Sequence, residues 1–533
     1  QSFDFNFPNP TNAPATLRVV TAAISESNTS FDIAVNGASV GGIAIGAVNG
    51  GTFAREGTLL IDLPLSSPDV SVTLTYNNAG NPASQGFLDF ISLTVPRNLA
   101  GTDGPFVFQK NNTLTGSGIA EYVLSDVANY SEIWEVTDPS AVGIIENNVR
   151  SLQGSARKFA IVHKTNFLNP LRESRRTLVP NQDLKGTIFD DENGNFKDID
   201  YLMITGDELL TEAERLAQHN RSFRGLNVKT VRLSEIYEEF GGGKQDIGAI
   251  RNLVRYVYEN ASSDARRLKY VCLFGDASVD YKDRIPNNTN YVPSFQAWQS
   301  FDLIRSFVSD DFFGCLDPNE GYLQNGSQTP HLPAGGQNDK LDVAVGRIVA
   351  DSKTRAKVIV DKIINYDKPE TFGRWRNNFV LISDDVDEVF EYNALEVNLD
   401  NLGDLIGDEK PFVNVIKIHS DSYEQQSSAG GDRYPQVNDA IANAIEVGSL
   451  VVTYLGHGGE DLLASEVIVT QDEVKRLDNG SRLPLVITVT CEFTKFDNPL
   501  RETGGEQFIW NPDGGAVGMI TTTREISVSL GVK

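Results

Sequence analysis

The stretch that decides the fold is LVVTYLGHGG, residues 450–459, together with PLVITVTC, residues 484–491. Each contains an apolar run suited to a buried strand, and Thr470-Gln471-Asp472-Glu473 between them has the capping-box form of a helix start. A strand–helix–strand unit of this kind is expected to place its strands parallel and side by side. His457 and Cys491 then follow these strands at one carboxyl edge of a sheet, where open α/β sheets bind ligands.

This pair of side chains suits nucleophilic catalysis on a carbonyl group. A free thiol with a pKa of ~8.5 is mostly protonated at neutral pH, and a nearby imidazole raises its thiolate fraction. The same imidazole can return a proton to a leaving amine. The glycines beside His457 allow close backbone approach, and the amides of Gly458 and Cys491 are candidates for an oxyanion hole. The alternative is a loop histidine and a buried cysteine that merely end two core strands.

The surrounding sequence predicts two series of parallel α/β units from about residue 200 onward. Apolar runs alternate with amphipathic stretches, which is typical of sheets covered by helices on both faces. We assign residues 200–370 to a first α/β subdomain and residues 371–533 to a second, which contains His457 and Cys491. A long polar segment, about 276–340, interrupts the first series, and such loops are usually functional or partly disordered.

The sequence before residue 200 has the pattern of an all-β region. Apolar and polar residues alternate in several short runs, separated by turn signals, and residues 1–100 are therefore predicted to form a β-sandwich or jelly roll. Residues 101–199 form a second β-rich region. Whether that region is a separate domain or completes the first is left open.

The composition narrows the classes of function. Lys and Arg number 46 against 72 Asp and Glu, a net charge of -26, and so acidic a surface repels nucleic-acid phosphates. No run approaches the ~20 apolar residues of a membrane span. Three cysteines make no disulfide framework. Cys272 lies in an apolar strand and is assigned to core packing, whereas Cys315 is expected as a free loop thiol, with a Cys272–Cys315 bridge as the alternative.

A cluster of acids follows the first predicted strand of the second α/β series. Asp384, Asp385 and Glu388 are candidate ligands for a structural Ca²⁺, since this ion prefers oxygen donors. The alternative is that these acids simply occupy a helix N-terminus, where the dipole favours negative charge. The identity of any metal therefore stays open.

Three motifs resemble those of gingipain-type cysteine peptidases. They are the segments 454–460 around His457 and 483–493 around Cys491, and the run 511–524, NPDGGAVGMITTTR, which resembles the PorU-type sortase branch of the type IX secretion system. The resemblance covers roughly residues 200–533. The all-β front resembles the non-catalytic region of PorU-type proteins more weakly.

The resemblance implies a caspase-like fold of two α/β subdomains and assigns roles by position. Cys491 matches the nucleophile and His457 the general acid/base, with Asp342, just before the run Val343–Arg347, as the acid that orients the histidine. No cofactor is implied for catalysis. The position of the acidic specificity residue in Arg-specific members falls on Thr354 or Arg355, which does not favour basic P1 side chains.

The resemblance also implies a function at the cell surface. Sortases of this branch cleave C-terminal sorting domains from type IX-secreted proteins and attach the cargo to an anionic lipopolysaccharide. The implied partners are these secreted proteins, the lipopolysaccharide acceptor and an outer-membrane β-barrel that holds the enzyme on the extracellular face. Two alternatives remain: a secreted endopeptidase that only hydrolyses, and a non-catalytic binding module on a peptidase scaffold.

Overall fold

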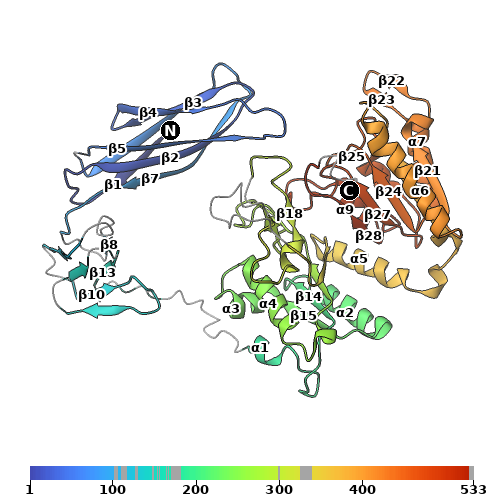
Figure 1. Cartoon of the computed structure of the whole chain (residues 1–533), viewed down its shortest axis with the longest axis horizontal. Helices are drawn as coiled ribbons and strands as arrows, with labels where there is room; N and C mark the ends of the chain where they lie inside the picture. The colour runs from blue at the N-terminus through green and yellow to red at the C-terminus, as the bar shows by residue number, and fades with distance from the viewer. Residues whose placement is uncertain are drawn as a thin grey trace. The chain divides into compact units, whose positions relative to one another are not determined.

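The chain forms two compact units, Gln1–Pro180 and Asn181–Lys533, each considered on its own (Figure 1). The computed structural model describes residues 1–65, 67–100, 106–109, 117–125, 130–146, 149–152, 154, 156–163, 165, 167, 169, 182–297, 300–323 and 339–526. None of the helices in these ranges is long and apolar enough to cross a membrane.

The first unit begins with a β-sandwich, as the alternating sequence pattern predicts. All pairings in its two sheets, ordered β1-β6-β3-β4 and β5-β2-β7, are antiparallel. Inward-facing residues such as Leu17, Ile33 and Val72 are almost fully buried between the sheets. The strands are β1 Ser2–Asn6, β2 Ala15–Ile24, β3 Thr29–Val35, β4 Ala38–Ile45, β5 Arg55–Leu63, β6 Asp69–Asn77 and β7 Gln85–Thr94.

A smaller β structure follows within the same unit. It comprises a sheet ordered β11-β10-β13-β8 and the pair β12-β9, around a small core in which Phe108 stacks on Phe159 with ring centroids 5.5 Å apart. Its strands are β8 Phe106–Gln109, β9 Ile119–Tyr122, β10 Glu132–Glu135, β11 Gly143–Ile145, β12 Val149–Leu152 and β13 Lys158–Val162.

The second unit starts before the predicted boundary at residue 200. Helix α1 (Leu184–Thr187) contacts α3, and Ile188, Phe189 and Ile199 lie in the core beneath the first α/β sheet. Residues 182–199 therefore pack with the α/β region, because burial in that core removes their apolar side chains from water.

The first α/β sheet is parallel and has the order β15-β14-β16-β19. Helices α3 and α4 cover one face through Ile236 and Leu253, and α2 and α5 cover the other through Leu216 and Ile359. The elements are β14 Tyr201–Thr205, α2 Leu210–Arg224, β15 Val228–Arg232, α3 Leu233–Phe240, α4 Ile247–Glu259, β16 Tyr270–Phe274, β19 Ala344–Ile348 and α5 Lys353–Tyr366.

The second α/β sheet is also parallel, with the order β21-β20-β24-β27-β28. Helix α6 packs on one face through Leu399, and α7, α8 and α9 pack on the other through Val437, Val474 and Phe508. The elements are β20 Asn378–Ser383, α6 Asn398–Glu409, β21 Asn414–His419, α7 Pro435–Val447, β24 Val451–Leu455, α8 Gln471–Arg476, β27 Leu485–Val489, α9 Gly504–Trp510 and β28 Gly518–Ile520.

Short elements fill the connections between these strands and helices. Three two-stranded pairs and several single helical turns lie in the loops. They are η3 Asp264–Arg266, β17 Phe295–Gln296, β18 Val308–Ser309, η4 Asp310–Phe313, η6 Pro369–Thr371, η7 Arg374–Asn377, the π-helical turn η8 Asn393–Val397, η9 Ser420–Ser422, β22 Gln426–Ser428, β23 Gly431–Arg433, β25 Leu462–Leu463 and β26 Val469–Thr470.

The two α/β sheets are joined by contacts between α5 and α9. The buried Lys362 ammonium on α5 donates to the carbonyls of Phe508, Ile509 and Asn511, which caps the end of α9. The first sheet thereby supports the helix that packs under the second.

The cysteines follow the sequence analysis in part. Cys272 is buried in β16, as expected for core packing. Cys315 is a free loop thiol, as expected, and it is buried; all three cysteines are free, so the alternative of a Cys272–Cys315 bridge is wrong.

Candidate active site

His457 lies in a tightly held turn after β24. Its backbone N–H donates to Asp384 Oδ2 at 2.7 Å, and its carbonyl accepts from the Tyr454 hydroxyl at 2.6 Å and from the Ala464 amide at 2.9 Å. The chain passes so close to Asp384 that a Cβ on Gly456 would lie 2.3 Å from the Cβ of Asp384. The glycine before the histidine is therefore required by close approach of the two backbones.

The imidazole of His457 pairs with a buried carboxylate. Nε2 lies 3.0 Å from Oε1 of Glu391, whose side chain is 4% exposed, whereas the histidine side chain is 42% exposed. Burial opposes protonation of His457, but the bond to Glu391 and the nearby Asp384 charge outweigh it and raise the histidine pKa. Burial likewise opposes ionisation of Glu391, yet hydrogen bonds from the Glu388 amide and from His457 lower the Glu391 pKa.

Cys491 lies at the end of the neighbouring strand, as the strand–helix–strand pattern predicts. Strands β24 and β27 pair in parallel with Leu455 opposite Val489, so His457 and Cys491 each follow the paired position by two residues. The predicted capping box at Thr470 is also present at the start of α8. The sequence prediction of one shared sheet edge is therefore confirmed.

The thiol of Cys491 is engaged by the chain segment that follows β28. Sγ lies 3.5 Å from the amide nitrogen and 3.7 Å from the carbonyl oxygen of Ile526. Burial raises the thiol pKa, the Ile526 amide partly opposes this, and the carboxylates of Glu525 and Glu492 raise it further. This arrangement favours the protonated thiol, and the imidazole of His457 is bonded to Glu391.

The predicted oxyanion donors lie beside the candidate nucleophile Cys491. Gly458 forms an antiparallel bridge with Leu463 whose two hydrogen bonds use the His457 carbonyl and the Gly459 amide, which leaves the Gly458 amide outside the ladder. A Cβ on Gly458 would lie 2.5 Å from Thr490 Oγ1, so this glycine directly adjoins the residue before Cys491. The backbone around both strand ends therefore suits the role proposed for the amides of Gly458 and Cys491.

Ionic contacts join the histidine loop to the cysteine loop. Lys495 Nζ lies 3.0 Å from Oε1 of Glu460 and 2.7 Å from Oε1 of Glu492. Glu492 itself has a φ of 52°, an uncommon conformation for a residue with a side chain. The bridge and the turn together hold the backbone immediately after Cys491.

The role predicted for Asp342 is wrong in this structure. Asp342 precedes β19, at the amino end of the first sheet, and its Oδ2 accepts from the Leu316 amide at 3.0 Å. Glu391 has the position beside His457 instead. Its signal in the sequence is the order of strands, because β20 pairs with β24 and the loop after β20 therefore opens at the catalytic edge.

The structure brings together only part of the predicted acidic cluster and adds Glu466 to it. Carboxylate atoms of Asp384, Asp385 and Glu466 lie within 4.8 Å of one another, whereas Glu388 is exposed and lies outside this group. Glu388 instead donates its backbone amide to Glu391 Oε2 at 2.8 Å. Burial, opposed by the His457 amide and reinforced by the Asp385 charge, raises the pKa of Asp384.

The comparison with protein families decides what this second unit is. The model of Peptidase family C25 matches residues 195–531. The chain belongs to this family. The C25 match contains both sheets and every residue of the site described above.

Solved structures show which C25 folds are similar. Dimeric latent PorU from Porphyromonas gingivalis matches 70% of this chain with a TM-score of 0.57 and 20% identity, and the match covers 36% of the PorU chain. The RgpB pro- and mature-domain complex from the same organism matches 62% of this chain and 66% of its own, at 19% identity and a TM-score of 0.42. No curated protein sequence matches the chain. The PorU fold thus extends over 70% of this chain, and the chain spans about a third of the length of PorU.

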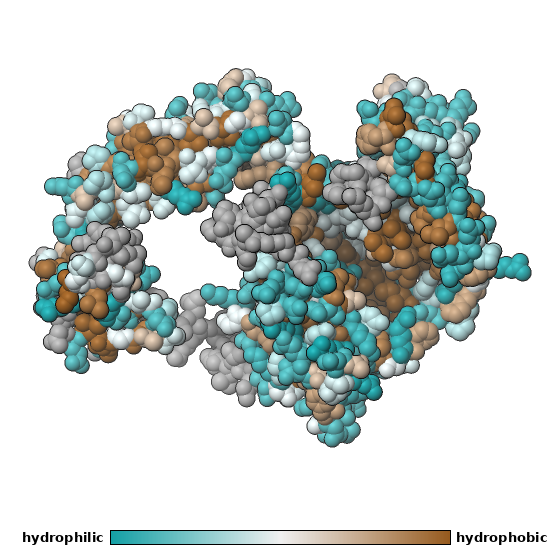
Figure 2. Space-filling view, in the orientation of Figure 1, coloured by the Kyte–Doolittle hydropathy of each residue, from teal (hydrophilic) through white to brown (hydrophobic). Residues whose placement is uncertain are grey.

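A groove adjoins the cysteine in this C25 domain. It has a volume of about 750 Å³ and runs between the 304–311 loop, strands β27 and β28, and the segment 521–526. Figure 2 shows apolar side chains inside a hollow beside these strands. Since Val489 and Ile526 both line the groove, it passes next to the Cys491 thiol.

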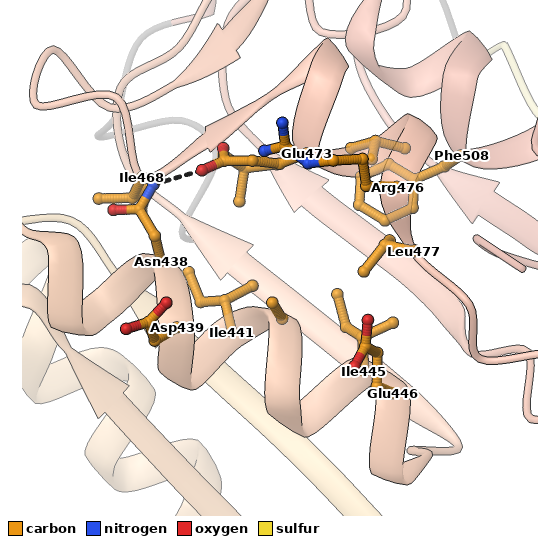
Figure 3. A pocket seen from close by; sticks show the side chains of 13 residues that line it. Asn438, Asp439, Ile441, Ile445, Glu446, Ile468, Glu473, Arg476, Leu477 and Phe508 are labelled. Carbon is orange, nitrogen blue, oxygen red and sulfur yellow. Dashed lines mark hydrogen bonds between the residues drawn. The ribbon is translucent and has the colours of Figure 1, made fainter.

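A smaller cavity of about 190 Å³ lies between α7 and α8 and is lined by residues from both helices and by Phe508 (Figure 3). There Asn438 Nδ2 donates to Glu473 Oε1 at 2.9 Å, and neither His457 nor Cys491 lines the cavity.

In Arg-specific relatives the specificity residue is acidic, but the matched position in this chain is Thr354 or Arg355, which is neutral or basic. Arg355 lies on α5, bonds to Asp351 and, at 2.5 Å, to Glu502 Oε1, and places its guanidinium 3.6 Å from the ring centre of Trp510. These partners make Arg355 a contact between the two sheets. A preference for basic P1 residues gains no support from it.

Proposed function

We propose that this chain is the catalytic part of a PorU-type sortase: a cysteine endopeptidase that cleaves C-terminal sorting domains and passes the cargo to an amine. The observation that carries the proposal is the placement of His457 and Cys491 on neighbouring parallel strand ends within a C25 fold. Glu391 supports the histidine, and the groove beside Cys491 offers room for an extended peptide.

The geometry favours a defined proton path. With Nε2–H of His457 donating to Glu391, Nδ1 is the atom that accepts the thiol proton. The Cys491 thiolate attacks the scissile carbonyl, and the amides of Gly458 and Cys491 donate to the oxyanion. His457 then protonates the departing amine, which leaves an acyl group on sulfur as a thioester.

The second half of the reaction distinguishes a transferase from a hydrolase. An amine attacks the thioester while His457 takes its proton, and the new amide leaves as the thiolate is released. Glu525 and Glu492 place negative charge close to the sulfur, which favours the approach of an ammonium-bearing acceptor. We propose an anionic lipopolysaccharide as the acceptor.

The setting of the enzyme follows from the same proposal. The cargo is a type IX-secreted protein with a C-terminal sorting domain, and the enzyme works on the extracellular face of the outer membrane with a β-barrel protein as its anchor. Support comes from the similarity to the PorU fold and from the sequence motifs around residues 454–460, 483–493 and 511–524.

Before it reacts, the thiol must leave Ile526. The structure pairs Cys491 with this segment and His457 with Glu391, so movement of residues 522–526 is the step that allows sulfur and imidazole to meet. The hydrogen bonds of Glu492 N–H to the Arg524 carbonyl and of Thr494 N–H to the Thr522 carbonyl, each 3.2 Å, are those that would break.

A transfer assay tests the proposal. A cargo domain carrying a sorting domain is incubated with the enzyme and with an amine acceptor, and the products are separated by mass. An amide-linked product that grows with acceptor concentration supports a sortase, and a free carboxylate product alone supports the hydrolytic alternative. Absence of any cleavage, with wild type and the Cys491→Ala variant behaving alike, would overturn the assignment of an enzyme.

A further inference from the structure

A second histidine of the same sheet, His419, lies at the end of strand β21. Strands β20 and β21 pair in parallel, with Ser383 directly opposite His419. Nδ1 of His419 lies 2.7 Å from the Ser383 hydroxyl oxygen, and Nε2 lies 3.3 Å from Oδ1 of Asp400 on helix α6. The imidazole therefore joins the end of β20 to the helix that packs on this sheet.

A serine, a histidine and an aspartate in this order also form the catalytic triad of many hydrolases, but burial excludes that role here. A nucleophile must reach its substrate, whereas Ser383 is fully buried, at 0% exposed. Asp400 is shared with Lys417, whose Nζ lies 2.7 Å from the same Oδ1 atom. The group is therefore suited to hold two chain segments at a fixed spacing.

Those two segments are the ones that hold His457. Asp384 directly follows Ser383 and accepts the backbone N–H of His457 at 2.7 Å. Glu391, 3.0 Å from His457 Nε2, comes just before the π-helical turn η8, which continues into α6. His419 thus bonds to the residue before one of these acids and to the helix that follows the other.

The turn after His419 contacts the same loop. The Ser420 hydroxyl donates to the Ser383 carbonyl at 3.0 Å, and the Val386 amide donates to Asp421 Oδ2 at 3.1 Å. Single π-helical turns such as η8 occur frequently at functional sites. The chain between the end of β20 and α6 is therefore held at both ends by contacts with the end of β21.

Apolar packing holds α6 on the sheet independently of this polar bridge. Leu395 and Leu399 are buried together with Leu381 of β20. Burial of such side chains contributes more to stability than one hydrogen bond does. Loss of the bridge is therefore expected to alter the spacing of strand end and helix rather than to unfold the chain.

We propose that His419 is a positioning residue that orients His457. By joining the end of β20 to α6, its imidazole sets the spacing between the two carboxylates that hold His457, one on its backbone and one on its ring. Misplacement of a catalytic group by about 1 Å can cost ~10²-fold in rate. The kinetic consequence rests on the proposed function, whereas the bond from His457 to Glu391 can be observed without substrate.

His219, at the first α/β sheet, provides a matched control. Its Nε2 lies 2.8 Å from Oδ2 of Asp367, the residue that ends α5, and its side chain is 14% exposed, as is that of His419. Replacement of either histidine by alanine removes a largely buried ring bonded to an aspartate. His219 lies on α2, which packs on the other sheet, so its loss leaves the two segments that hold His457 in place.

NMR of the His457 ring tests the positioning without turnover. In the Cys491→Ala chain, the Nε2–H signal of His457 is identified by its response to Glu391→Gln. It should shift or disappear in His419→Ala, because the bond to Glu391 is then misaligned, and stay unchanged in His219→Ala.

A second variant keeps this test decisive if His419→Ala misfolds. Ser383→Ala removes one end of the bridge with little change in volume and should displace the same His457 signal. A signal that both variants leave unchanged overturns the proposal. An equal change in His219→Ala would show a general loss of stability and would also overturn it.

Peptide cleavage measures the consequence for the reaction. His419→Ala and Ser383→Ala should lower kcat by roughly tenfold or more with little change in KM, because the fully buried serine cannot contact substrate. His219→Ala should keep kcat within about twofold of wild type. A displaced His457 signal with unchanged kcat refutes the role in the reaction. A displaced signal in a chain that cleaves no peptide supports the positioning of the ring, while the proposed function fails.

Discussion

The two α/β sheets of the second unit have the same construction, but the candidate nucleophile Cys491 and the candidate base His457 both lie at the second. Both are parallel and both have helices on two faces. Around the first sheet the polar groups are turned inward and paired: Arg347, almost fully buried, makes two 2.7 Å bonds to Asp310, and Asp276 accepts from Thr289 at 2.8 Å. At the second, His457 and Cys491 remain partly accessible.

The difference shows that sheet topology creates an edge where a site can form. Whether the side chains at that edge can react depends on whether they are already paired with one another. Parallel sheets bring strand ends together at one edge in both cases. In the first sheet Arg347 is paired with Asp310, and contacts such as Trp510 Nε1 donating to the Val349 carbonyl at 2.8 Å support the second sheet. In the second, His457 and Cys491 after β24 and β27 stay partly exposed, although Asp384 after β20 is buried.

The largest expected effect contrasts one cysteine from each sheet. Cys491→Ala should reduce cleavage by ~10⁴-fold or more, because loss of a nucleophile removes the covalent route, and should leave the melting temperature nearly unchanged. Cys272→Ala, in the buried strand β16, should keep the turnover number but lower the free energy of unfolding by about 1 kcal/mol through a small cavity. Peptide cleavage and thermal melting of both variants give the comparison. Full activity of Cys491→Ala would remove the distinction between the sheets.

The next effect concerns the acid that orients the histidine. Glu391→Gln should lower kcat by ~10²-fold or more, since it removes the charge that fixes the imidazole and stabilises its protonated form. Asp342→Asn is the matched control at the first sheet, where the acid accepts from the Leu316 amide, and should stay within about twofold of wild type. Steady-state kinetics on one peptide measures both. A larger loss for Asp342→Asn than for Glu391→Gln would reverse the assignment.

A smaller effect is expected at the glycines after the histidine. Gly458→Ala places a methyl group 2.5 Å from Thr490 Oγ1 and 3.1 Å from the Leu462 carbonyl, which displaces the amide proposed for the oxyanion hole. The loss in kcat should be roughly 10–10²-fold, below that for complete removal of an oxyanion donor. At Gly459 a Cβ meets nothing within 4 Å, so Gly459→Ala should change kcat little. Equal losses for the two variants would show that the loop as a whole, rather than the Gly458 amide, matters.

Much of this arrangement could be predicted from the sequence because it depends on short-range patterns. Apolar runs, capping signals and strand–helix–strand spacing predicted both parallel sheets and the shared edge of His457 and Cys491. The β-sandwich followed from alternation in the same way. These features are local, and a single chain segment determines each of them.

The parts that the sequence analysis missed depend on side chains that meet across distant segments. Glu391 and Glu466 lie in irregular loops, where no periodicity tells which carboxylate turns toward a histidine or toward Asp384. The family resemblance points to Asp342 because it precedes the matching run 343–347, yet in the structure it lies before β19, at the amino edge of the other sheet. The burial of Cys315 likewise depends on how the long loop folds over the first sheet.

The smallest expected effect is a shift in the pH dependence of kcat/KM, which reports the protonation of His457. Because Glu391 and Asp384 raise the His457 pKa, the neutral imidazole that accepts the thiol proton forms only above that raised value. The acid limb of kcat/KM should therefore lie above the ordinary histidine range near 6.5. Glu391→Gln removes one source of this shift, so the limb of its residual activity should move to lower pH. NMR titration of the His457 ring in the Cys491→Ala chain, with and without Glu391→Gln, reports the same displacement without turnover. An imidazole pKa that stays unchanged, or rises, when Glu391 is neutralised would show that Glu391 holds the ring in place but does not control its charge.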